Sequence, residues 1–248
     1  MKKGIGIYCT VCSNELAISL ATLGEASRSS SVSKIIILLT DSLFESTYQL
    51  SNKITLCMRN FGKGYDTSIE EGGYDQVSAR NYTLDFLDTE DIDWVMMHDA
   101  DDIYDPDFYD FILETHSYND AVTCSCFTFR DINTLCVPQR KELAFNGSIF
   151  HDPHTRIWKK SLNLRYEKSK GVEGYFVNHS RHCGVVFPET TMFGFTDRPW
   201  HFHLHALLNK RHSKKIFEYP IVNIEPPVSV KEFLERNLQA FNLSQIRT

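Results

Sequence analysis

The feature that most constrains this chain is a short apolar segment that runs directly into a group of carboxylates. Residues 94–97 read Trp-Val-Met-Met, a pattern typical of a buried strand, and Asp99, Asp101 and Asp102 follow at once. Carboxylates in this position lie where open α/β sheets bind their ligands. Acids this close repel one another unless a cation or a hydrogen-bonding ligand joins them. Oxygen ligands suit Mg²⁺ or Mn²⁺, and these ions suit phosphates, although a solvated acidic turn would also satisfy the pattern.

The length and composition are those of a globular protein. The 248 residues are 42% hydrophobic and 23% charged, so the chain is long enough for a substantial core. Its apolar runs are shorter than a membrane span, and its N-terminus is too polar for a signal peptide, so we expect no membrane span and a cytoplasmic location. The seven cysteines lack a regular framework spacing. Free thiols are therefore favoured, with a redox or zinc pair at Cys9 and Cys12 as the alternative.

Charge is distributed unevenly along the chain. The formal net charge is −6, yet residues 66–110 hold fifteen acids against one arginine, and residues 139–215 hold fourteen basic residues against six acids. An acidic first half followed by a basic second half indicates a metal-assisted centre beside a surface that binds anions.

The first 60 residues predict alternating strands and helices. Strands are expected at 4–10, 34–40 and 53–59, because these segments are short and apolar. Helices are expected from Ser13 to Ser27 and from 43 to 51. This β-α-β-α-β order predicts the opening of a doubly wound α/β sheet.

The remaining elements are expected as follows. A helix at 75–87 precedes the acidic segment, a second follows it at 108–115, and an amphipathic helix is expected at 228–243. Strands are expected at 120–129 and 155–160, with polar loop and strand between them.

The order of these parts resembles the nucleotide-sugar domain of GT-A glycosyltransferases, and family 2-like enzymes are the most similar group. The specific part is a helix with Ala-Arg-Asn at 79–81, followed by the apolar strand and Asp-Ala-Asp-Asp at 99–102. The resemblance covers residues 4–130. It implies a Rossmann-like GT-A fold, in which a mixed, mostly parallel sheet is flanked by helices in a single domain with a C-terminal helix.

The domain organisation follows from the same resemblance. We expect one GT-A domain over residues 1–225, with a nucleotide-sugar-binding half at 1–130 and an acceptor half at 131–225. Residues 226–248 are expected to form the C-terminal amphipathic helix.

The resemblance also implies roles for individual residues. Thr10 and Asp41, at the ends of the first two strands, would face the nucleoside base. Arg80 would lie near the diphosphate or hold the acidic loop, and Asp99 would contact the ribose or a metal-bound water. Asp101 would bind the Mn²⁺ or Mg²⁺ that bridges the diphosphate. From the residues alone, Arg80 could instead pair with acids across the loop, and Asp41 could cap a helix.

Three histidines stand at every second position, at His201, His203 and His205. On a strand all three would share one face, whereas on a helix they would splay apart. GT-A enzymes often supply a histidine from such a region as a further metal ligand, so His203 or His205 is the predicted ligand. His201 is the next candidate for this role. Partly buried packing histidines and an independent zinc site built from the three are the alternatives.

A catalytic base is the remaining site prediction. In inverting members of the family, an acidic pair in this region supplies the base that deprotonates the acceptor hydroxyl. Glu173 is the best match, but Gly174 stands where the second acid is expected. A surface glutamate is the alternative.

The sequence therefore favours a metal-dependent glycosyltransferase, a hexosyl- or pentosyltransferase that moves a sugar from a nucleotide-sugar donor to an acceptor hydroxyl. A UDP-sugar is the expected donor and a glycan the expected acceptor. A hydroxylated base in DNA, as in bacteriophage-type DNA glycosyltransferases, is the alternative acceptor. Two other classes stay open: a nucleotidyltransferase and a non-catalytic nucleotide-sugar-binding module.

Overall fold

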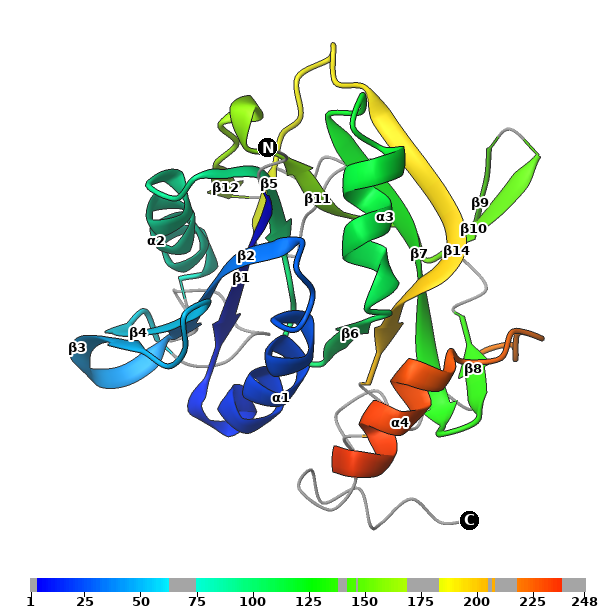
Figure 1. The fold of residues 1–248 in the computed structure, drawn as a ribbon, viewed down its shortest axis with the longest axis horizontal. Helices are drawn as coiled ribbons and strands as arrows, with labels where there is room; N and C mark the ends of the chain where they lie inside the picture. Colours follow the sequence, from blue (N-terminus) through cyan, green and yellow to red (C-terminus); the bar gives the residue numbers. More distant parts are fainter. Residues whose placement is uncertain are drawn as a thin grey trace.

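The computed structural model describes residues 4–62, 75–137, 142–145, 147–168, 183–204, 207 and 218–237. Its centre is a 10-stranded sheet in the order β3-β4-β2-β1-β5-β11-β7-β14-β6, with β8 paired to β7 (Figure 1). Two smaller sheets pair β9 with β10 and β12 with β13. The elements of the first half are β1 (Gly4–Val11), η1 (Ser13–Glu15), α1 (Leu16–Ala26), β2 (Val32–Leu39), β3 (Asp41–Gln49), β4 (Ile54–Asn60), α2 (Gln76–Asp88), β5 (Ile92–Met97), β6 (Asp102–Tyr104) and α3 (Asp107–Thr115). Those of the second half are β7 (Ala121–Asp131), β8 (Thr134–Cys136), β9 (Glu142–Phe145), β10 (Ser148–His151), β11 (His154–Lys159), η3 (Lys160–Leu162), β12 (Tyr166–Lys168), β13 (Cys183–Val185), β14 (Phe193–His203) and α4 (Val228–Asn237).

The strands β4, β2, β1 and β5 are parallel neighbours, as their apolar character predicts. Alternate residues of β1 and β2 enter two separate cores. Ile7 and Ile37 pack on the face covered by α1, α3 and α4, whereas Tyr8 and Ile36 pack on the face covered by α2. The sheet is therefore buried on both sides, and the predicted α/β class is confirmed.

The expected helix at 43–51 is wrong. The structure has strand β3 there, which pairs antiparallel with β4 and forms the edge of the sheet. Leu43 and Phe44 are largely exposed, so their side chains do not pack on the sheet as those of a covering helix would. Its serines and threonine favour helices weakly, and pairing with β4 satisfies its backbone groups along one side. The first elements along the chain are therefore β1, η1, α1, β2, β3 and β4.

The second half of the sheet is mixed. Strand β11 is antiparallel to both β5 and β7, whereas β14 is parallel to β7 and antiparallel to β6. The strands expected at 120–129 and 155–160 are confirmed as β7 and β11. The C-terminal helix begins at Val228 as predicted and is described to Asn237. In the described part of the chain, no helix has both the length and the apolar character needed to span a membrane.

All seven cysteines are buried, and none of them forms a disulfide in the described structure. Cys9 lies in the core beneath α1, and Sγ of Cys12 lies 3.5 Å from Oγ1 of Thr40. The clusters of potential metal ligands in the described residues include neither of them.

Candidate donor and metal site

The carboxyl ends of β1, β2 and β5 lie side by side at one edge of the sheet. The amide of Thr40 donates to the carbonyl of Val11 at 2.8 Å, and the amide of His98 donates to the carbonyl of Tyr8 at 3.0 Å. Thr10, Asp41 and Asp99 stand at these strand ends. Three residues that the sequence predicts as donor contacts thus lie along the same edge.

Asp41 is held by Ser13, the first residue of the short helix η1. Its two carboxylate oxygens accept from the amide of Ser13 at 2.9 Å and from the Ser13 hydroxyl at 2.7 Å. Asp41 does not cap a helix of its own, because β3 follows it, but it satisfies a backbone donor at the beginning of η1.

The acidic turn at 99–102 is anchored on several sides. The amide of Asp102 donates to the carbonyl of Asp99 at 3.1 Å, and Oδ2 of Asp102 accepts from the amide of Asp99 at 3.3 Å. Helix α1 holds the turn through the Thr22 hydroxyl, which donates to the carbonyl of Ala100. The carbonyl of Asp101 accepts from the amide of Leu204 at 2.8 Å, which ties the turn to the end of β14.

Arg156 is a site residue that the sequence analysis missed. Its guanidinium donates to Oδ2 of Asp99 at 2.8 Å and contacts Sδ of Met97 at 3.3 Å. Burial lowers the pKa of Arg156, but Asp99 and Asp102 outweigh this effect and hold the pKa above its ordinary value. The strand position of Arg156 on β11 becomes informative only once β11 is known to adjoin β5.

Arg80 is buried on α2, on the face of the sheet that α2 covers. Its guanidinium contacts Sγ of Cys183 at 3.6 Å and lies 5.0 Å from the ring centroid of Tyr166. The Tyr166 hydroxyl in turn bonds to the hydroxyl of Tyr8 at 2.6 Å. These contacts place Arg80 beside β12 and β13, on the face of the sheet that α2 covers.

The histidines at 201 and 203 lie on a strand and share one face of it. His203 stands opposite Asp102 in the β14–β6 ladder, and Nδ1 of His203 lies 2.7 Å from Oδ1 of Asp102. Nε2 of His201 lies 3.0 Å from the same oxygen. One ligand atom each of Asp101, Asp102 and His203 lies within 4.8 Å of the others. The structure thus brings together Asp101 and His203, which the sequence predicts as metal ligands.

This pairing changes the protonation of the three side chains. Burial lowers the pKa of His201 and His203, but the negative charges of Asp102 and of the Cys126 thiolate outweigh it, so both pKa values lie well above the ordinary value. Burial raises the pKa of Asp102, but the two imidazoles outweigh it and lower that pKa well below its ordinary value. In the metal-free protein these buried charges are stabilised because opposite charges lie in contact, whereas a bound metal ion would displace the imidazole protons.

The sheet also places Cys126 and His154 beside these histidines. Sγ of Cys126 lies 3.8 Å from Nε2 of His201, and the His154 ring centroid lies 5.4 Å from that of His201. Cys126 stands two residues after Cys124 on the strand expected at 120–129, so the two side chains share a face, but nothing in the sequence connects Cys126 with His154.

Two predicted site residues, Glu173 and His205, lie outside the described residues. Their roles as catalytic base and metal ligand stay predictions.

No protein-family model and no curated protein matches the chain. Solved structures match it. TarS 1–349 from S. aureus in complex with UDP-GlcNAc has a TM-score of 0.50 at 13% identity, covering 96% of this chain and 73% of that chain. A 4-diphosphocytidyl-2C-methyl-D-erythritol synthase from Anaerococcus prevotii has a TM-score of 0.37 at 15% identity, covering 64% of this chain and 73% of that chain.

The likeness to TarS, together with the sheet order, defines the fold class. This chain has a GT-A-like fold, in which a mixed central sheet is flanked by helices in a single domain. The resemblance identified from the sequence is thus confirmed at the level of fold.

Proposed function

We propose that this chain is a metal-dependent glycosyltransferase that moves a sugar from a UDP-sugar donor to a hydroxyl of an acceptor glycan. One observation carries the proposal: Asp101, Asp102 and His203 meet within 4.8 Å at the carboxyl edge of a GT-A-like sheet. That edge is where α/β sheets bind ligands. The proposal is supported by TarS, a protein of similar fold whose structure holds UDP-GlcNAc.

The residues present suit a divalent cation. Carboxylate oxygens and an imidazole nitrogen are ligands that Mn²⁺ accepts, and Mg²⁺ prefers the oxygens. Asp101 and Asp102 are 5% and 0% exposed, so water screens their attraction for a bound cation only weakly. When bound, the cation supplies charge stabilisation for the diphosphate that leaves the donor.

The chain's own residues have distinct tasks in this proposal. Asp41 and Thr10 contact the nucleobase, and Asp99 contacts the ribose. Arg156 orients Asp99, because it holds one carboxylate oxygen at 2.8 Å and leaves the other for the donor. Arg80 is buried on the α2 face of the sheet and does not contact the donor directly in this proposal. Its positive charge stabilises the bound diphosphate through the electrostatic potential of the site.

The transfer step breaks the bond between the sugar's anomeric carbon and the diphosphate oxygen and forms a bond to the acceptor oxygen. UDP leaves with the electron pair. The acceptor hydroxyl loses its proton to the carboxylate of Glu173, because a neutral hydroxyl is a weak nucleophile. His205 is the proposed second histidine for the cation.

The first experiment is thermal unfolding with a panel of nucleoside diphosphates and nucleotide sugars, with and without Mn²⁺. A ligand at 100 times its Kd stabilises the native state by about 2.7 kcal/mol, on the order of 5–10 °C for a chain of this length. We expect a Mn²⁺-dependent shift with UDP that is lost in Asp101→Ala. The control Asp93→Asn removes an exposed carboxylate from β5 and should keep the shift. No shift with any nucleotide would overturn the proposal.

Product analysis separates the competing classes. Incubation with a UDP-sugar, Mn²⁺ and acceptor panels of glycans and hydroxymethylated DNA should release UDP and label a glycan. Labelled DNA would move the acceptor to the alternative class. Release of pyrophosphate from UTP and a sugar phosphate would indicate a nucleotidyltransferase, and binding without turnover would indicate a non-catalytic module.

A further inference from the structure

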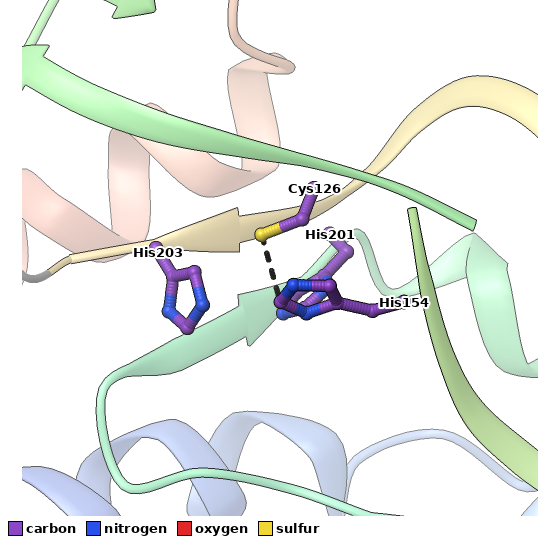
Figure 2. Close-up of side chains that lie close together, drawn as sticks. All are labelled: Cys126, His154, His201 and His203. Atoms are coloured by element: carbon purple, nitrogen blue, oxygen red, sulfur yellow. Dashed lines mark hydrogen bonds between the residues drawn. The ribbon is translucent and has the colours of Figure 1, made fainter. Parts of the chain in front are cut away.

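We propose that Cys126, His154, His201 and His203 bind one zinc ion, at a second metal site that adjoins the cation site of the donor diphosphate and shares His203 with it. The four side chains converge from three strands (Figure 2). The proposal does not depend on the proposed function, because three of its four residues have no part in the proposed transfer.

The geometry of the four side chains fits one ion. One potential ligand atom from each residue lies within 4.8 Å of the other three. Zinc bonds of about 2.3 Å to sulfur and 2.0–2.1 Å to nitrogen, at tetrahedral angles, separate the two ligand atoms by about 3.6 Å. Sγ of Cys126 lies 3.8 Å from Nε2 of His201. That pair therefore already stands near the separation that a shared zinc ion requires.

The sheet register makes the site rigid. His201 stands directly opposite Cys126 in the parallel β14–β7 ladder, and His154 stands opposite Cys124 in the β11–β7 ladder. His203 follows His201 by two residues and thus shares its face. All four ligands are on strands, so the backbone holds them in place before an ion binds.

The chemistry of the ligands selects zinc. Cysteine thiolate and imidazole suit zinc, whereas Mg²⁺ and Mn²⁺ prefer oxygen. Cys126 is 1% exposed and His201 is fully buried, and the carboxylate of Asp102 lies 3.0 Å from His201. A zinc ion would balance the combined charge of the Cys126 thiolate and the Asp102 carboxylate in a site away from solvent.

The ligands are not equivalent. His154 already has partners, because Arg156 donates to its Nδ1 at 3.2 Å and Asp152 lies 3.4 Å from its Nε2. Binding through His154 weakens these contacts. His203 belongs to both the zinc group and the Asp101 group. Cys126 and His201 thus belong to the zinc group alone. The Cys126 thiolate is the ligand that absorption spectroscopy can detect when a suitable metal ion is bound.

The test loads the metal-free protein with Co²⁺ and then with Zn²⁺. A thiolate bound to Co²⁺ gives an intense near-ultraviolet charge-transfer band that oxygen and nitrogen ligands do not give. We expect one equivalent of Co²⁺ to produce this band and Zn²⁺ to abolish it by displacement. Cys126→Ser should lose the band. Cys136→Ser removes another buried thiol, on the neighbouring strand β8, and should keep it.

Two further variants separate the outcomes. Asp101→Ala should keep the band even where it loses the Mn²⁺-dependent shift with UDP, so each proposal can fail alone. His154→Gln should weaken zinc affinity at least tenfold, roughly the loss that even indirect partners of a metal ligand cause. Circular dichroism of each metal-free variant establishes that it folds. A band that is absent from the wild type, or that survives in folded Cys126→Ser, would overturn the proposal. If Cys126→Ser does not fold, unchanged zinc affinity in folded His154→Gln would overturn the four-ligand site.

Discussion

Oδ1 of Asp102 lies 2.7 Å from Nδ1 of His203, directly across the ladder between β6 and β14. The same carboxylate oxygen lies 3.0 Å from Nε2 of His201. Asp102 ends the acidic turn that follows β5, whereas the histidines end the last strand of the sheet. This contact therefore joins the turn after β5 to the end of β14, and the side chains of Asp102 and His201 are fully buried there.

Asp102→Asn should destabilise the metal-free protein by about 3–5 kcal/mol. The substitution removes one partner of a buried ion-paired group and leaves the histidines without their counter-charge. Urea unfolding followed by circular dichroism measures the change. Asp93→Asn, at an exposed position of β5, should stay within about 0.5 kcal/mol of the wild type. Equal stability of the two variants would show that the Asp102 pairing contributes nothing.

Arg156→Met should destabilise the chain by about 1–3 kcal/mol and weaken UDP binding. The guanidinium donates a charge-assisted bond to Asp99, but Asp99 is partly exposed and regains water, which limits the loss. Arg165→Met is the matched control, because Arg165 pairs with Asp88 at the surface and should change stability by less than about 1 kcal/mol. Calorimetric titration with UDP and Mn²⁺ checks binding. Unchanged affinity in Arg156→Met would remove its role in orienting Asp99.

Glu173→Gln should lower sugar transfer by about 10²–10⁴-fold and leave UDP binding unchanged. The amide keeps the shape of the side chain but cannot accept the acceptor proton. Single-turnover transfer assays measure the rate. Glu167→Gln changes an exposed glutamate on β12 and should transfer at the wild-type rate. Full activity of Glu173→Gln would mean that another group is the base.

Leu43→Ala and Phe44→Ala should each stay within about 0.5 kcal/mol of the wild-type stability. Both side chains are exposed on β3, at 86% and 72%, so truncation removes little buried surface. A helix packed on the sheet would bury such residues, and the same changes would then cost about 2–5 kcal/mol. Phe108→Ala is the positive control, because Phe108 is fully buried on α3. Its expected loss of unfolding free energy is about 3–5 kcal/mol. Thermal and urea unfolding distinguish these outcomes.

Local patterns predicted much of the fold. The sequence predicts the strands β1, β2 and β5, because a strand buried on both faces is a short continuous apolar run. It predicts the helices α2 and α3, because a helix buried on one face has apolar residues at helical spacing. The sequence does not predict strand β3, because this strand forms by pairing with β4 at the edge of the sheet and not through an apolar pattern of its own.

The sequence by itself determined the α/β class and the acidic turn that contains Asp99 and Asp101, whereas only the structure decided that His201 and His203 share a strand face. The class and the turn depend on neighbours a few residues apart, whose spacing is visible in the chain. The tertiary structure decided which distant residues meet them. Arg156 lies 57 residues from Asp99, and His201 lies 75 residues from Cys126. Such pairs are set by strand order and register, which depend on the packing of the whole sheet and not on any local period.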